Sequence, residues 1–215
     1  MFGTLSIAEL ILRAVTFLIA MAVHEYAHSY IAYRMGDTTA KDLGRMTLDP
    51  RANIDIYGFF MAIVIGFGFL GSAPVDEYRM RDRRWGMFWA VAAGPISSLL
   101  LAVVFSIPFW FGMQPSVPGP RAFVPSLTDF VTRMVVLNVY LGLFNLIPLA
   151  PLDGWTMMLK LLPPSTAQMI GQYRRESSYI FFGLIIISFL LPQFNLLGII
   201  LGPPAALVLH LLRVI

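Results

Sequence analysis

The stretch FLIAMAVHEYAHSYIAY, residues 17–33, places two histidines and a glutamate inside an otherwise apolar run. His24 and His28 are four residues apart, and Glu25 directly follows the first of them. Ionisable side chains are costly in hydrocarbon, and in membrane helices they usually pair with one another or serve a function. The stretch therefore raises the question of what stabilises three polar groups at this depth in an apolar segment.

The composition of the protein is typical of an integral membrane protein. Of its 215 residues, 58% are hydrophobic and 13% are charged, and the mean hydropathy is +0.75. A soluble domain carries about 25% charged residues. The sequence has no cysteine, so any metal site must use His, Asp or Glu. No basic patch indicates nucleic acid, and we expect one membrane-embedded domain over residues 1–215 with the lipid bilayer as a partner.

Five apolar segments are long enough to cross about 30 Å of hydrocarbon at about 1.5 Å per residue, although the fourth is rather short. They cover about residues 5–34, 85–112, 127–149, 178–191 and 196–212, and the last two form a C-terminal helical hairpin over about 178–213. A sixth run, GFFMAIVIGFGFLG at 58–71, is short and contains four glycines. Glycine at this density disfavours helix, so we predict a re-entrant or β-like segment. The predicted fold class is an all-α polytopic membrane protein with about five transmembrane helices.

The basic residues favour this arrangement. If the run at 58–71 does not cross the membrane, 12 of the 15 Lys and Arg residues fall on one side, and Arg213 near the C-terminus is among them. The positive-inside rule then places the N-terminus outside and the basic side in the cytoplasm. We therefore expect a multi-pass protein of the cell membrane.

The motif HEYAH, residues 24–28, has the H-E-x-x-H spacing. Positions i and i+4 lie on one face of a helix, so His24 and His28 can present two imidazoles to one ion. In this arrangement the two histidines bind zinc, which activates water, and the glutamate acts as general base. The alternative is that both histidines form hydrogen bonds between helices. The intramembrane position favours the metal site, with Glu25 as the base.

A catalytic zinc ion needs a third protein ligand and an open position. His210 is the remaining histidine, and we interpret it as a hydrogen-bonding residue at a helix end or between helices. The better candidate is Asp153, in FNLIPLAPLDGWTMM, where prolines interrupt an apolar segment and let a short side chain point into the bundle. Alternatively, Asp153 caps the helix that follows at Trp155. The residues alone leave both interpretations open.

Topology adds a constraint on this pairing. His24 lies in the second half of the first span and Asp153 follows the third. The two can meet only if both spans run toward the same face, which requires that the run at 58–71 does not cross. A straight third span would leave Asp153 near the interface and His24 about 15 Å deeper. We therefore expect the backbone to fold back after the third span, or water to reach inward.

These motifs resemble the site-2 protease family of intramembrane zinc metalloproteases. HEYAH matches the HExxH helix of that family, and NLIPLAPLDG at 145–154 matches its N-x-x-P-x-x-x-L-D-G signature. AAGPISSLL at 92–100 resembles its G-P-x-x-N element, with Ser98 in place of the usual Asn. IGFGFLGSAPV at 65–75 resembles its glycine-rich segment, without the usual Lys before Pro-Val. The resemblance covers about residues 7–159.

The resemblance implies an intramembrane zinc endopeptidase that cleaves transmembrane protein substrates within or near the bilayer, as in regulated intramembrane proteolysis. One Zn²⁺ per protein molecule would be held by His24, His28 and Asp153, with Glu25 as general base. Asn145 would hydrogen-bond the oxyanion or the substrate backbone, or else a neighbouring helix. The sequence resembles a compact prokaryotic member without a PDZ or CBS domain, whose active site lies toward the cytoplasm. The glycine-rich segment is a candidate strand partner for an extended substrate.

Two other functions are compatible with the same residues. In a transporter, His24, Glu25 and Asp153 would form an ion or proton path, and an interrupted helix is common in such proteins. The absence of an inverted repeat in the sequence argues against that function. A protease-like protein that binds partners without cutting them is the other alternative. The substrate, the cleavage site, the regulation, the oligomeric state and the effect of Ser98 are left open.

Overall fold

The computed structural model describes residues 6–53, 55–64, 74–116 and 125–215. Throughout these ranges the regular secondary structure is helical. The predicted all-α class is therefore confirmed for the described part of the protein.

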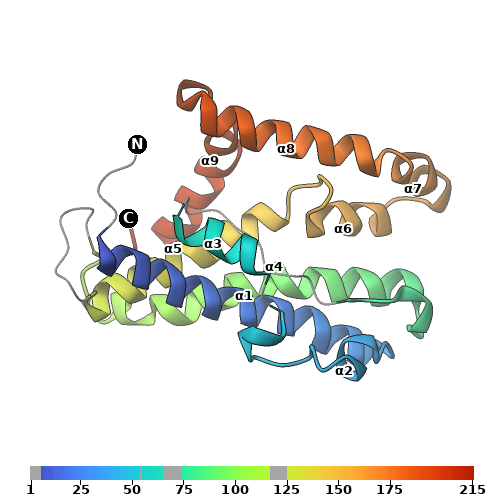
Figure 1. The fold of residues 1–215 in the computed structure, drawn as a ribbon, viewed down its shortest axis with the longest axis horizontal. Coiled ribbons are helices and arrows are strands. Elements are labelled where there is room, and N and C mark those ends of the chain that lie inside the picture. Colours follow the sequence, from blue (N-terminus) through green and yellow to red (C-terminus); the bar gives the residue numbers. More distant parts are fainter. Residues whose placement is uncertain (1–5, 54, 65–73, 117–124) are drawn as a thin grey trace.

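Three long helices lie side by side and form the body of the protein (Figure 1). They are α1 (Ile7–Met35), α4 (Arg83–Trp110) and α5 (Leu127–Asn145), and each is long and apolar enough to cross a membrane. The fourth and fifth predicted segments are also helical, as α8 (Arg174–Leu190) and α9 (Leu196–Leu211), but both are shorter than the other three. Three of the five predicted spans are therefore helices of sufficient length and apolar character, and the count of five spanning helices stays a prediction.

Local sequence explains where the long helices begin and end. Ser6 caps α1 by accepting a hydrogen bond from the Glu9 backbone N–H, and Gly36 ends the helix at a φ of 112°. This left-handed backbone favours glycine, which has no Cβ. Asp82 caps α4, and Ser126 opens α5 with a capping box. The side chains that end each apolar run therefore satisfy the exposed backbone groups of its helix.

Short helices lie between the longer ones along the chain. They are α2 (Thr39–Asp42), η1 (Pro50–Ala52), α3 (Ile56–Val64), η2 (Glu77–Arg79), α6 (Asp153–Leu161), α7 (Pro164–Gly171) and η3 (Pro192–Phe194). The helix α3 covers the first part of the glycine-rich run and packs on α1, where Phe59 and Ala62 contact a cluster with Phe17 and Met21. Residues 65–73 lie outside the described residues, so the predicted re-entrant segment stays a prediction.

An ion-pair network joins α1 to α5 near the start of α1. The buried Glu9 carboxylate accepts a hydrogen bond from Arg13 Nε at 2.8 Å and another from Arg133 of α5. Arg13 also donates to the Ile63 carbonyl of α3, at 3.3 Å. The network therefore ties three elements together at the end of the bundle away from the α1 C-terminus.

The position of α9 differs from the sequence prediction. Leu209, Leu212 and Val214 pack in one apolar cluster with Phe109 of α4 and Val131 of α5. The Arg213 guanidinium lies 4.2 Å from the centre of a tryptophan ring, that of Trp110 at the C-terminal end of α4. In Figure 1 the C-terminus of the protein accordingly lies near the start of α1. Placing Arg213 with the basic residues of the opposite end was therefore wrong, because apolar packing holds α9 beside the end of α4.

Candidate metal centre

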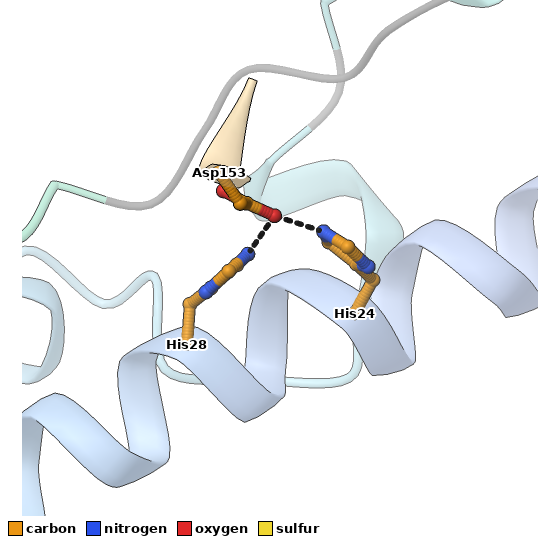
Figure 2. A group of neighbouring side chains, drawn as sticks. All are labelled: His24, His28 and Asp153. Carbon is orange, nitrogen blue, oxygen red and sulfur yellow. Dashed lines mark ion pairs between the residues drawn. The ribbon is translucent and has the colours of Figure 1, made fainter. Parts of the chain in front are cut away.

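Three predicted ligands converge on one point (Figure 2). His24 and His28 project from one face of α1, and Asp153 is the first residue of α6. The Asp153 Oδ2 atom lies 3.2 Å from His24 Nε2 and 3.3 Å from His28 Nε2. These residues form the group of His, Asp and Glu side chains in the described part of the protein that can hold a metal ion.

The geometry of this group fits a tetrahedral zinc ion. Zinc binds nitrogen and carboxylate oxygen at about 2.0–2.2 Å, which separates neighbouring tetrahedral ligands by about 3.3 Å. The two measured separations are close to that distance. The Asp153 Oδ2 atom is also buried without a hydrogen-bond partner among the described residues. A cation between the three atoms would satisfy this oxygen.

The second nitrogen of each imidazole is held by α4. His28 Nδ1 lies 2.9 Å from the Ala90 carbonyl oxygen, and His24 Nδ1 lies 2.9 Å from Ser98 Oγ. A carbonyl can only accept, so His28 carries a proton on Nδ1, and Nε2 is the nitrogen that would offer its lone pair to a metal ion. Ligand histidines in metalloproteins are commonly oriented in this way by a second hydrogen bond.

Asp153 is available as an ionised ligand. Burial raises the pKa of its carboxyl, but the imidazoles of His28 and His24 lower it more, so this pKa lies well below its usual range. The alternative role, in which Asp153 caps the following helix, is wrong. Leu152 is the N-cap residue of α6, and no side chain forms a capping hydrogen bond at this N-terminus.

The segment after α5 folds back to bring Asp153 to the histidines. The helix ends at Asn145, and residues 146–152 form turns with a cis peptide bond between Ala150 and Pro151. The Ala150 backbone N–H donates to Ser177 Oγ at 3.0 Å. Gly154 packs so closely on the preceding turn that a Cβ would lie 2.4 Å from two carbonyl oxygens. The predicted fold-back is confirmed, and the glycine permits it.

Gly94 of α4, for which the sequence suggested no role, also borders the site. Gly94 of α4 faces both imidazoles, and a Cβ there would lie 2.2 Å from His28 Nε2 and 2.6 Å from His24 Nε2. Ala90, Gly94 and Ser98 are spaced i, i+4 and i+8, so they share one face of α4. The G-P-x-x-N element, which contains Gly94 and Ser98, was the available signal. It becomes interpretable only once α4 is known to pack against α1 at the two histidines.

The remaining candidate residues have clear positions. Glu25 is buried on α1 next to His24 in sequence. Asn145 is the last residue of α5, and its Nδ2 donates to the Leu141 carbonyl at 3.0 Å. His210 lies exposed in the last turn of α9 and is not part of the metal-ligand group. The catalytic roles of Glu25 and Asn145 stay predictions.

A cavity of about 490 Å³ lies beside α6. Its walls include Val75 from the segment after the glycine-rich run, Trp155 and Thr156 of α6, and Arg174 at the start of α8. Thr156 follows Asp153 by three residues, which is about one helical turn. The cavity therefore lies along α6, the helix that begins with Asp153.

Comparison with known proteins identifies bacterial relatives. The chain is 34% identical over 176 residues to the Bacillus subtilis protein named "Putative zinc metalloprotease YwhC", covering 80% of this chain and 78% of the relative. It is 25% identical over 186 residues to a Mycolicibacterium smegmatis protein named "Putative zinc metalloprotease Rip2", covering 83% of this chain and 66% of the relative. The Rip2 protein of Mycobacterium tuberculosis is 26% identical over 185 residues. No protein-family model and no solved structure matches the sequence.

Proposed function

The chain belongs to the site-2 protease family of zinc metalloproteases, and on this basis we propose its function. Its proposed activity is that of an intramembrane endopeptidase that cleaves transmembrane protein substrates within or near the bilayer. One observation carries this proposal. The Asp153 carboxylate oxygen lies 3.2–3.3 Å from the Nε2 atoms of two histidines, His24 and His28. Both histidines belong to α1, a helix that is apolar enough to cross a membrane.

The proposed ligands of one zinc ion are His24, His28 and Asp153. A bound zinc ion supplies Lewis acidity, which polarises the scissile carbonyl and lowers the pKa of water. Glu25 is the proposed general base, because it follows His24 on α1 and is buried where a proton held by its carboxylate is shielded from bulk water. It takes a proton from the attacking water and passes it to the departing amine.

Asn145 is the proposed contact for the substrate. One N–H of its amide is used by the Leu141 carbonyl, and an amide NH₂ has a second N–H to donate. That second N–H would bind the oxyanion or a substrate carbonyl as the peptide bond is attacked. Peptide residues beyond the cut bond would enter the cavity beside α6, the helix that begins with Asp153.

The proposed location is the cell membrane of a bacterium, with the site toward the cytoplasmic side. The bacterial relatives and the three apolar helices support this location. His24 and His28 lie in the second half of α1, and basic residues concentrate at the C-terminal end of α1 and directly after it, including Arg34, Lys41 and Arg45. Cytoplasmic loops of membrane proteins carry an excess of such residues.

The decisive experiment separates metal binding from cleavage. Zinc content and cleavage of a membrane-anchored reporter are measured for the wild type, Glu25→Gln and Asp153→Asn. The Glu25→Gln variant is expected to keep zinc and to lose at least about 100-fold in cleavage rate, because general acid–base catalysis contributes about that much. The Asp153→Asn variant is expected to lose both. Cleavage that persists in Glu25→Gln would refute the proposed mechanism.

A further inference from the structure

We propose that Ser98 is a positioning residue that sets the affinity of the metal centre. Its hydroxyl accepts the His24 Nδ1–H, which fixes the ring tautomer and keeps the Nε2 lone pair pointed at the metal. This inference rests on the proposed function only in taking zinc as the ion. It concerns a residue at which the protein departs from the usual family motif, since Asn is common there.

The contact between Ser98 and His24 is direct and enclosed. Ser98 Oγ lies 2.9 Å from His24 Nδ1, across the interface between α4 and α1. Ser98 is 0% exposed and His24 is buried, so bulk water cannot take the place of the hydroxyl. The opposite edge of the same ring faces Asp153 Oδ2 at 3.2 Å. The His24 imidazole thus lies between Ser98 on one edge and Asp153 on the other.

Other serines of α4 use their hydroxyls differently. Ser97 Oγ donates to the Gly94 carbonyl and Ser106 Oγ to the Val103 carbonyl, each at 2.7 Å and each within its own helix. This bonding to a preceding turn is common for serine in helices. Ser98 instead contacts a metal-ligating histidine of another helix. That difference distinguishes its role from ordinary helix packing.

The two ligand histidines depend on α4 in different ways. His28 is oriented by the Ala90 backbone carbonyl, which no side-chain substitution removes. His24 is oriented by a side-chain hydroxyl, so its geometry depends on the residue at position 98.

A residue as short as serine reaches His24 because the two helices are so close. At Gly94, one turn before Ser98, a Cβ would lie within 2.6 Å of both imidazoles. A hydroxyl one bond from Cβ therefore suffices where the longer amide of Asn is usual. Gly94 allows the two helices to approach closely, and Ser98 uses that approach to contact His24.

Removal of the hydroxyl would weaken zinc binding without removing a ligand. Without an acceptor for Nδ1–H, the His24 ring can rotate or place its proton on Nε2, and a protonated Nε2 cannot bind a metal. Loss of an orienting contact of this kind lowers metal affinity about 10- to 100-fold. We expect a loss of this size in Ser98→Ala.

The test measures zinc affinity of the full-length protein in detergent by competition with a chelator. The variants are Ser98→Ala, Ser98→Thr and Ser106→Ala, and the thermal unfolding of each metal-free protein is recorded. Ser106 is the matched control, because it is 1% exposed on the same helix and its hydroxyl donates to the Val103 carbonyl of that helix. We expect weaker binding in Ser98→Ala, near wild-type binding in Ser98→Thr, which keeps a hydroxyl, and no change in Ser106→Ala.

Several outcomes would overturn the proposal. Wild-type affinity in Ser98→Ala would do so, as would an equal loss in Ser106→Ala. Equal losses in the alanine and threonine variants of Ser98 would assign the effect to side-chain volume rather than to the hydroxyl. Because the readout is zinc affinity, a wild type that binds zinc but cleaves no substrate would refute the protease while leaving this test intact.

Discussion

At Gly94 the backbone of α4 touches the side chains that bind the proposed metal. The atoms that a Cβ would meet are the two Nε2 atoms that face Asp153 and a ring carbon of His28. An imidazole displaced by a methyl group would no longer direct its lone pair at the ion. The glycine therefore contributes to the site by leaving space, although it has no chemistry of its own.

The first residue-scale prediction concerns this space. Gly94→Ala is expected to lower zinc affinity by at least about 100-fold, because contacts of 2.2–2.6 Å force both imidazoles to move. The measurement is chelator competition on the purified protein. Gly183→Ala in α8 is the matched control, because a Cβ there meets nothing within 4 Å. Wild-type zinc affinity in Gly94→Ala would show that the helices separate easily at this point.

The helix α6 begins with Asp153, the proposed metal ligand. Its position depends on the turns after α5 and on contacts at its far end. There Arg84 of α4 donates to the carbonyls of Lys160 and Leu161, at 2.8 and 3.2 Å, and Lys160 pairs with Glu77. A cation at a helix C-terminus stabilises the unpaired carbonyls. Contacts at both ends therefore set where Asp153 lies.

The element-scale prediction concerns the turn that precedes α6. Gly154→Ala would place a Cβ 2.4 Å from the Leu146 and Ile147 carbonyl oxygens, which are backbone atoms and cannot rotate away. We expect destabilisation of about 1–3 kcal/mol, as for overpacking in a core, together with loss of bound zinc. Thermal unfolding and zinc content check both effects.

A neighbouring glycine provides the control for this change. At Gly171 of α7, the nearest atom to a Cβ is the Leu159 Cδ1 at 3.8 Å, an ordinary contact. Gly171→Ala should therefore leave zinc content unchanged. If Gly154→Ala also bound zinc normally, the position of Asp153 would not depend on the close turn.

The buried ion pairs and the proposed metal centre lie at different places along α1. The Glu9 network with Arg13 and Arg133 lies near the start of α1, whereas the proposed ligands His24 and His28 lie in its second half. The C-terminus lies near the first of these places, through the contact of Arg213 with Trp110. This arrangement conflicts with the side of the membrane to which the charge count assigned Arg213.

The topology of the protein can be tested by labelling, because the sequence has no cysteine. Leu43, Phe111 and Ile215 are exposed, so we expect a single cysteine at each position to react with a membrane-impermeant thiol reagent on its own side of the membrane. Phe111→Cys and Ile215→Cys are expected to react from one side of the membrane, and Leu43→Cys from the other. The measurement is labelling in sealed vesicles of known orientation. Labelling of Ile215→Cys together with Leu43→Cys would instead support the charge-based topology.

Sequence alone predicted the features that depend on local spacing and composition. The apolar runs indicated the long helices, and their ends agree with α1, α4 and α5 to within a few residues because caps and prolines are local signals. The i, i+4 spacing of His24 and His28 fixed a shared face. The motif after the third span identified Asp153, although its choice between ligand and helix cap stayed open.

Only the tertiary structure decided which surfaces meet. Asp153 reaches His24 and His28 because residues 146–152 fold back after α5. Gly94 and Ser98 acquire roles because α4 packs against α1 at the histidines. The placement of Arg213 depends on apolar packing of α9, which a charge count does not measure. Contacts between helices distant in sequence depend on side-chain shape, and no local pattern in a single sequence encodes that shape.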